Sequence, residues 1–260
     1  MKIMIIGAGV VGTATGEGFS RMGRDVIFFD TDPDKTDKLK KKGYKAYSNE
    51  NWPIEEADIY FICVEEWNVD KVFDKWHEIF KNNPPKYIII RSTVSLGTTE
   101  KLRSEYGGII VHNPEFLRER DALYDFIYPN KIVIGRSLFL EEYDHFFKYL
   151  YKSFNAPIIF TDSNTSEFLK LASNAVLSSY ISTWNQLKLI ADAVGINSHQ
   201  IAKILTLDPR ISKYGTIHGK KFGGFCLPKD LETLIKIARE NNVDPYLLVT
   251  IKSINKVMPE

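Results

Sequence analysis

Lys2-Ile3-Met4-Ile5-Ile6 leads directly into Gly7-Ala8-Gly9-Val10-Val11-Gly12 at the start of the chain. A short apolar run followed by G-x-G-x-x-G is typical of a strand, a tight turn and the start of a helix. The first glycine allows the turn, the second lets the backbone approach a pyrophosphate, and the third lets helix and strand pack closely. Unpaired N–H groups at the start of the helix attract phosphate. The stretch therefore predicts a dinucleotide-binding α/β fold, with cofactor contacts at Gly7, Gly9, Val10, Val11 and Gly12.

An acidic residue closes the next apolar run, as this motif requires. Residues 26–29 are Val-Ile-Phe-Phe, and Asp30 follows them, eighteen residues after Gly12. A carboxylate here accepts hydrogen bonds from ribose hydroxyls and repels a 2′-phosphate. No arginine stands among residues 31–34, so we expect NAD rather than NADP. The alternative is a glycine-rich turn beside a solvated aspartate, but the order of strand, helix and acidic residue favours a cofactor site.

Short apolar runs continue through the first 160 residues and alternate with polar segments that are compatible with helices. The runs cover residues 3–6, 26–29, 59–64, 87–90, 109–111, 131–134 and 157–160. Such a pattern indicates parallel strands joined by crossover helices. We therefore predict an α/β class fold, with a Rossmann-like, doubly wound sheet in a domain of residues 1–160.

A different pattern begins after Thr161. Residues 164–193 contain neither proline nor glycine, and apolar side chains recur there at helical spacing. Asn164 and Glu167 fit a capping box, and Gly195 is placed to end the helix. We predict a long central helix at about residues 164–194, roughly 45 Å long, within a mainly α-helical second domain of residues 161–260. A helix of this length commonly spans two domains or forms a subunit interface, and we expect a homodimer through it.

The composition excludes several classes of function. Of the 260 residues, 44% are hydrophobic and 26% are charged, which allows a buried core and argues against disorder. The 34 basic and 33 acidic residues leave a net charge of +1, too little to attract nucleic acid or an anionic membrane. No apolar run reaches the roughly 18 residues of a membrane span, and the start of the chain lacks a signal-peptide core. The two cysteines indicate a reducing cytoplasm rather than a disulfide framework.

One cysteine lies in a glycine-flanked segment. Residues 223–230 are Gly-Gly-Phe-Cys-Leu-Pro-Lys-Asp, a turn that enters a helix, and Pro228 suits the first helical turn. Unpaired N–H groups, the helix dipole and Lys229 all favour the thiolate form of Cys226. The alternative is a small buried hydrophobe, a description that fits Cys63 within its apolar run. Cys226 is therefore the predicted nucleophile.

These segments together resemble the nucleotide-sugar 6-dehydrogenases, the UDP-glucose/GDP-mannose dehydrogenase family. The resemblance rests on residues 7–12, Arg91-Ser92-Thr93-Val94, Asn113-Pro114-Glu115-Phe116-Leu117-Arg118-Glu119, Lys170-Leu171-Ala172-Ser173-Asn174 and residues 222–230. Their order and approximate spacing match the family over nearly the whole chain. The resemblance implies oxidation of a sugar primary alcohol to a carboxylate with two NAD.

The resemblance also implies catalytic roles. Cys226 would attack the aldehyde, and the thiohemiacetal would be oxidised to a thioester that water hydrolyses. Lys170 would stabilise oxyanions with help from Asn174, and their spacing of four residues places both on one helix face. Asp230 would activate water or hold Lys170.

Further positions follow from the same resemblance. Thr93 and Glu115 would position or deprotonate the water, and Glu119 would lie near the cofactor or the catalytic group. Further cofactor contacts are expected at Val64, Thr93 and Lys229. Substrate contacts are expected at Glu115, Phe116, Leu117, Lys170, Asn174, Phe222 and Gly223, and at Arg210, which would reach a sugar or sugar nucleotide across a dimer. No metal is expected.

The chain departs from the family pattern at three places. Cys63-Val64-Glu65-Glu66 stands where the family has Cys-Val-x-Thr-Pro beside the cofactor. Lys220 and Lys221 precede Phe222 where the family usually has glycine, which indicates either a preference for an anionic substrate or a solvated pair. Family members also have a third domain that grips the nucleotide, and it would lie beyond Glu260. We therefore expect that this chain supplies few of the nucleotide contacts.

Two other functions stay open. Relatives that act on 3-hydroxy acids or phosphogluconate also place Lys-x-x-x-Asn on the long helix, and Lys170 would then be the general acid and base of a two-electron oxidation. The other alternative is a non-catalytic, NAD-binding dimer. The chemically suitable residues argue against it: Thr93, Glu115, Lys170, Asn174, Cys226 and Asp230.

Overall fold

The computed structural model describes residues 1–48, 57–82, 87–224 and 226–260, and for residues 76–82 the backbone alone. The chain divides into two compact units, Met1–Lys170 and Leu171–Glu260. The boundary predicted at residue 160 falls in the last strand of the first unit, β8 (Ile158–Thr161). The division into domains 1–160 and 161–260 stays a prediction.

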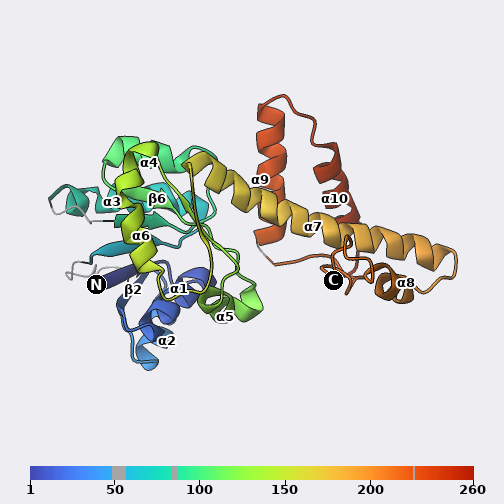
Figure 1. Cartoon of the computed structure of the whole chain (residues 1–260), viewed down its shortest axis with the longest axis horizontal. Coiled ribbons are helices and arrows are strands. Elements are labelled where there is room, and N and C mark those ends of the chain that lie inside the picture. Colours follow the sequence, from blue (N-terminus) through green and yellow to red (C-terminus); the bar gives the residue numbers. More distant parts are fainter. Residues whose placement is uncertain (49–56, 83–86, 225) are drawn as a thin grey trace. The chain divides into compact units, whose positions relative to one another are not determined.

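The first unit is built on an eight-stranded sheet (Figure 1). Its order is β3-β2-β1-β4-β5-β6-β7-β8, which confirms the doubly wound fold. The strands before β8 are β1 (Lys2–Ile6), β2 (Asp25–Asp30), β3 (Lys45–Ser48), β4 (Ile59–Ile62), β5 (Tyr87–Ile90), β6 (Ile110–His112) and β7 (Ile132–Gly135).

The sheet differs from the predicted all-parallel pattern at one junction. Strands β6 and β7 pair antiparallel, with His112 opposite Gly135, whereas the other described pairs are parallel. The connection between them holds a 3₁₀ turn, η1 (Glu119–Asp121), and the short helix α5 (Ala122–Ile127). A helix of six residues is only about 9 Å long, too short to carry the chain back along the sheet for a parallel return.

Strand β3 is an element that the apolar pattern did not predict. Its sequence is Lys-Ala-Tyr-Ser, and it stands at the edge of the sheet order beside β2. An edge strand that is only partly buried needs no continuous apolar run. The pattern therefore found the buried strands and missed the polar one.

Helices cover both faces of this sheet (Figure 1). Successive strand side chains point to opposite faces, so Ile3 and Ile5 belong to one core and Met4 and Ile6 to the other. The first core includes side chains of α1 (Val10–Arg21), α2 (Pro33–Lys41), α5 and α6 (Asp144–Leu150), the last of which follows the 3₁₀ segment η2 (Leu138–Tyr143). The second includes side chains of α3 (Glu66–Asn82) and α4 (Thr98–Tyr106). Connections thus leave β1 and β4 toward opposite faces, which makes the carboxyl ends of these two strands the switch point where such folds bind ligands.

Helix α7 spans Ser163–Ala193, within one residue of the prediction at each end. Its predicted cap was wrong. Asp162 accepts hydrogen bonds from the backbone N–H and the hydroxyl of Thr165, at 2.8 and 2.6 Å, so Asn164 lies inside the first turn. Gly195 follows the helix with a φ of 71°, the left-handed conformation predicted for the residue after a helix end.

Glu167, the other member of the predicted capping box, serves a different helix. Its carboxylate accepts hydrogen bonds from the backbone N–H groups of Gly97 and Thr99, at 2.7 and 2.8 Å. It thereby caps α4, whose own N-cap residue is a glycine without a side-chain bond. A local and a long-range cap use the same residue types, so spacing alone could not separate them.

The second unit contains the rest of α7 with α8 (Ser198–Leu205), α9 (Cys226–Glu240) and α10 (Tyr246–Val257). Its apolar core joins Ala175 of α7, Phe222, Leu231 and Ile235 of α9, and Ile251 of α10. Across the described parts of the chain, no helix is long and apolar enough to span a membrane.

Candidate functional site

Residues 7–12 form a segment that we call the glycine loop. Its glycines differ in the space that surrounds them. A Cβ on Gly7, whose φ is 95°, would lie 2.4 Å from the Cys63 carbonyl oxygen, and a Cβ on Gly12 would lie 1.8 Å from the Gly7 carbonyl oxygen. A Cβ on Gly9 would meet no atom within 4 Å. Gly7 and Gly12 are therefore required by packing, whereas Gly9 leaves open space where a ligand can approach the backbone.

Asp30, the predicted ribose ligand, also holds the glycine loop in place. Its Oδ2 accepts a hydrogen bond from the Ala8 N–H at 2.6 Å, and its Oδ1 accepts one from the Asp32 N–H at 2.9 Å. Each carboxylate oxygen has a second lone pair for a ribose hydroxyl. Lys35 Nζ lies 3.5 Å from Oδ2, so a cation stands beside this carboxylate directly after residues 31–34.

The other predicted cofactor positions surround the carboxyl ends of the strands. Val10 is exposed at the start of α1, Val11, Val64 and Thr93 are half-buried, and Glu119 is exposed. The Val64 carbonyl accepts a hydrogen bond from the Ser92 hydroxyl at 2.6 Å. These positions, the Gly9 opening and the Asp30 carboxylate fit a dinucleotide, and the individual contacts stay predictions.

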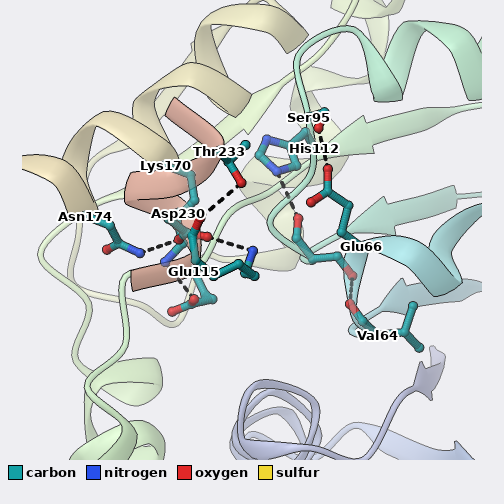
Figure 2. Close-up of polar contacts among 11 residues, drawn as sticks. Val64, Glu66, Ser95, His112, Glu115, Lys170, Asn174, Asp230 and Thr233 are labelled. Carbon is teal, nitrogen blue, oxygen red and sulfur yellow. Dashed lines mark hydrogen bonds and ion pairs between the residues drawn. The ribbon is translucent and has the colours of Figure 1, made fainter. Parts of the chain in front are cut away.

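The acidic departure after Val64 has a structural role. Glu66 begins α3, and its Oε1 accepts a hydrogen bond from the Ser95 hydroxyl at 2.5 Å (Figure 2). A carboxylate in the first turn of a helix is favoured by the helix dipole. This hydrogen bond joins the segments that follow β4 and β5, and it thereby links the carboxyl ends of these two strands. Glu66 does this at the place where the family pattern has Thr-Pro.

A buried ion pair lies at the next strand end. Glu115 follows β6, and its Oε1 is 2.7 Å from Lys170 Nζ on α7 (Figure 2). Glu115 Oε2 accepts a hydrogen bond from the Leu117 N–H at 2.7 Å. The exposed fractions of Glu115 and Lys170 are 6% and 3%. Since two charges removed from water need each other, the pair holds both side chains in a single orientation.

A second cation, Arg91, lies nearby and forms no ion pair with a carboxylate among the described residues. Arg91, the residue after β5, donates a 2.6 Å hydrogen bond to Asn113 Oδ1, and its buried Nε has no hydrogen-bond partner among the described residues. Tyr151 donates to the same Asn113 oxygen at 2.5 Å. Burial raises the pKa of the Tyr151 hydroxyl to about 12, and Arg91 acts in the opposite direction. Sequence reasoning gave Arg91 no role, although a charge directly after an apolar strand was a signal.

His112 is a further buried polar residue that sequence reasoning missed. Its Nδ1 lies 2.9 Å from the Ser166 hydroxyl and its Nε2 lies 3.3 Å from the Ser92 carbonyl oxygen. Burial lowers the pKa of His112 to about 3; the Ser92 carbonyl raises it, and Lys170 and Arg91 lower it further. His112 is therefore neutral and serves to join β6 to the start of α7.

The second unit holds a cluster of its own around Asp230. Asn174 Nδ2 donates a 2.5 Å hydrogen bond to Asp230 Oδ2 (Figure 2). Lys229 Nζ lies 2.7 Å from Asp230 Oδ1. The Lys229 contact is an ion pair by distance, but Oδ1 accepts no well-aligned hydrogen bond among the described residues. This oxygen can therefore accept a hydrogen bond from a further donor. Asp230 is fully buried, so such a donor would have to enter the site. The partner predicted for Asp230 was water or Lys170, and the described contacts are a hydrogen bond from Asn174 and an ion pair with Lys229.

The predicted cysteine is the first residue of α9 and is exposed. Among the predicted substrate residues of this unit, Gly223 is exposed and Phe222 is buried in the core. Arg210 is exposed and pairs with Asp208 at 2.6 Å. Lys221 forms an ion pair with Glu260, and Lys220 is exposed. Cys63 follows β4, and burial raises the pKa of its thiol to about 12, with Arg91 acting in the opposite direction.

Two family models match this chain. Residues 1–51 and 44–155 match the NAD binding domain of the UDP-glucose/GDP-mannose dehydrogenase family. Residues 164–257 match the central domain of the same family. The two matches extend over parts of both units. They contain all six of the predicted catalytic residues: Thr93, Glu115, Lys170, Asn174, Cys226 and Asp230.

Individual relatives agree with the family models. A putative UDP-glucose 6-dehydrogenase of Bacillus subtilis is 33% identical over 98% of this chain and 67% of its own length. A UDP-glucose 6-dehydrogenase of Campylobacter jejuni is 32% identical over 99% of this chain and 72% of its own. A UDP-glucose dehydrogenase structure from Pyrobaculum islandicum superposes with a TM-score of 0.88 at 25% identity, over 98% of this chain and 68% of that one. The chain thus spans about two thirds of the length of these dehydrogenases.

Proposed function

Because this chain belongs to the UDP-glucose/GDP-mannose dehydrogenase family, we propose that it oxidises the primary alcohol of a nucleotide sugar to a carboxylate with NAD. The first oxidation gives an aldehyde and one NADH. Cys226 adds to the aldehyde, the second oxidation gives a thioester and another NADH, and water releases the carboxylate and the thiol. UDP-glucose is the representative substrate, and the stoichiometry is two NADH for each sugar.

One observation carries the proposal. Helix α7 buries Lys170 and Asn174 one turn apart, each against a carboxylate. A buried cation and a buried amide cost stability unless they are paired, so a helix face with only a packing role favours apolar residues there. Side chains held in one orientation are suited to stabilise charge that develops on a substrate oxygen.

The cofactor contacts follow from the glycine loop. Bound NAD supplies the hydride acceptor for both oxidations. The open backbone at Gly9 and the start of α1 suit its pyrophosphate, and the carboxylate of Asp30 suits a ribose. Val64, Thr93, Glu119 and Lys229 are the further contacts that we propose.

Lys170 and Glu115 are suited to move the proton of the first oxidation. Glu115 accepts the alcohol proton, and the Lys170 ammonium at 2.7 Å stabilises the negative charge that develops on the alcohol oxygen. In the second half of the reaction the same ammonium, with Asn174, stabilises the oxygen of the thiohemiacetal. Thr93, Glu115 and Asp230 are the groups that we propose to orient or deprotonate the hydrolytic water.

Cys226 has the chemistry of a covalent catalyst. It is exposed at the first residue of α9, where the helix dipole favours an anion. Its thiolate divides one difficult oxidation into two easier steps. For the substrate we propose contacts at Phe116, Leu117, Phe222, Gly223 and Arg210, in addition to the catalytic residues.

We also propose that two copies associate through α7. Val176, Leu187 and Ile190 are exposed apolar residues at helical spacing on this helix. Light scattering at micromolar concentration should give the mass of a dimer, and a monomer would contradict the proposal.

A two-electron oxidation is the second candidate, because Lys170 and Asn174 by themselves supply an acid–base group and an oxyanion donor. This reaction needs no cysteine and gives one NADH for each substrate. The 3-hydroxy acids and phosphogluconate are its substrate classes. Stoichiometry therefore separates the two candidates.

The test is NADH formation with a panel of UDP-sugars, GDP-sugars and unlinked sugars, with NADH counted for each molecule of product. We expect two NADH and a carboxylate from one nucleotide sugar. Cys226→Ser should stop acid formation while aldehyde is still produced and can be trapped. Cys63→Ser is the matched control, since Cys63 has no proposed role.

Three results would count against the proposal. Full acid production by Cys226→Ser would exclude the covalent step. One NADH for each product would favour the two-electron reaction. Calorimetry that detects binding of NAD, with no NADH formed from any sugar of the panel, would favour the non-catalytic alternative over both reactions.

A further inference from the structure

Residues 219–222, here the cysteine loop, lie just before Cys226 and belong to no helix or strand. Backbone N–H and C=O groups outside regular structure still need hydrogen-bond partners when they are buried. Gly219 has a φ of 105°, a conformation that favours glycine, and Phe222 is 5% exposed. The partners of this loop therefore decide how the chain enters α9.

The first partner is Asn185 on α7. Its Oδ1 accepts a hydrogen bond from the Gly219 N–H at 2.8 Å, and its Nδ2 donates to the Lys220 carbonyl at 2.9 Å. Asn185 is fully buried, so its side chain is ordered by these two bonds rather than by water. One amide thus pairs with two successive residues of the loop, as a neighbouring strand would do.

The second partner is Asn255 on α10. Its Oδ1 accepts a hydrogen bond from the Phe222 N–H at 2.7 Å, and its Nδ2 donates to the Phe222 carbonyl at 3.0 Å. The Lys221 N–H between the two amides donates to the Pro259 carbonyl at 2.9 Å. Five polar groups of the loop backbone, at least one from each of its four residues, are therefore paired with α7, with α10 and with the segment that follows α10.

These bonds clamp the loop from two helices that are far apart in the sequence. The Phe222 side chain adds a third attachment, because it packs with Ala175, Leu231 and Ile251 in the core of the second unit. The chain then has only three residues before Cys226, the first residue of α9. A clamp so close to the thiol limits the directions in which the thiol can lie.

We propose that Asn185 and Asn255 are positioning residues that hold Cys226 for its attack on the aldehyde. The inference rests on the proposed function of Cys226. The two amides act on the second half of the reaction alone, since aldehyde formation does not use the thiol. We call the hydrogen bonds of Asn185 and Asn255 to residues 219–222 the clamp. When the clamp is lost, aldehyde leaves the enzyme before the thiol captures it.

The experiment compares Asn185→Ala and Asn255→Ala with Ser182→Ala. Ser182 is buried on α7 and donates to the Ile251 carbonyl of α10 at 3.4 Å, so its loss weakens the same pair of helices without touching the loop. Hydrogen exchange is measured by mass spectrometry on peptides that cover residues 219–222. With UDP-glucose or the best sugar of the panel, trapped aldehyde and carboxylate are measured together with NADH.

In both asparagine variants we expect exchange in residues 219–222 to be at least ~10-fold faster, because a loop without its partners opens locally. We expect the NADH yield to fall from about two toward about one for each sugar, with a matching rise in trapped aldehyde. Initial aldehyde formation should stay within about twofold of the unmodified chain. Ser182→Ala should change neither the exchange of the loop nor the ratio of products.

Two results would overturn the inference. One is loop exchange in the asparagine variants that equals that of Ser182→Ala. The other is faster exchange with an unchanged ratio of aldehyde to carboxylate, which would make the clamp structural only. A chain that forms no NADH with any sugar would instead remove the proposed function, and the positioning role with it, while the exchange result would still establish or refute the clamp.

Discussion

The glycine loop and the cysteine loop hold the chain by different means. In the glycine loop, the deciding contacts are close approaches of backbone to backbone, such as that of Gly12 to the carbonyl of Gly7. In the cysteine loop, the deciding contacts are side-chain amides, Asn185 and Asn255, that come from two other helices. The first kind of loop is specified mainly by its own glycines, which allow close packing on the carbonyls of Gly7 and Cys63, with one further hydrogen bond from Asp30. The second is specified by residues elsewhere in the chain.

The buried polar pairs of the candidate site resemble the cysteine loop, because they too join residues that are far apart in the sequence. The Lys170–Glu115 pair joins residues 55 positions apart, and the Asn174–Asp230 bond joins residues 56 positions apart. Long-range pairs of this kind cost much when one partner is lost, because the other stays buried. Local backbone packing fails in another way, through a clash that a single methyl group creates.

The largest effect on stability is expected when a buried pair that is far apart in the sequence loses one partner. Lys170→Met should lower the free energy of unfolding by about 3–5 kcal/mol, because the Glu115 carboxylate loses its buried counter-charge. The double variant Glu115→Gln, Lys170→Met should recover most of that loss, since no uncompensated charge remains. Urea unfolding measures both. A double variant that is no more stable than Lys170→Met would mean that packing, and not charge, sets the cost.

The next prediction tests the close packing of the glycine loop. Gly12→Ala should cost about 3 kcal/mol or more, since its Cβ would lie 1.8 Å from a backbone oxygen, and it should abolish NAD binding. Gly9→Ala is the matched control. Its Cβ meets no atom, so its stability should change by less than ~1 kcal/mol, while NAD binding weakens if the pyrophosphate approaches this backbone. Thermal unfolding and calorimetry with NAD separate the two quantities, and equal stability of the two variants would refute the close-packing role of Gly12.

The smallest effect, when it is measured over a single pH unit, concerns His112, another long-range contact. An unfolded histidine gains a proton near pH 6.5, whereas burial keeps the folded pKa at about 3. The unfolded state therefore holds one more proton between these pH values, so the free energy of unfolding falls as the pH is lowered, by up to ~1.4 kcal/mol per pH unit from this residue. His112→Gln should remove that part of the slope, and exposed His145→Gln should not. Equal slopes for His112→Gln and the unmodified chain would contradict a neutral, buried His112.

Much of the fold could be predicted because it depends on local patterns. Apolar runs marked the buried strands, and their order gave the doubly wound sheet. The absence of proline and glycine marked α7 to within one residue at each end. The polar edge strand β3 and the antiparallel step at β7 were missed, because neither leaves a strong apolar signal.

The candidate site was predictable in its residue types but not in its pairings. The spacing of Lys170 and Asn174 placed them on one helix face, yet nothing local indicated that Glu115 and Asp230 would be their partners. Glu167 illustrates the limit, since it has the spacing of a local cap and caps α4 instead. Arg91 and His112 were missed because their importance comes from burial.

The sequence by itself determined the glycine loop, the place of Asp30 after β2 and the long helix, because each depends on residues that are close along the chain. Only the tertiary structure decided which carboxylate each buried cation or amide meets and which side chains hold the loop before Cys226. The physical reason is that a backbone turn is selected by local sterics. A buried polar group is satisfied by whatever partner folding brings within hydrogen-bond distance, at any separation in the sequence.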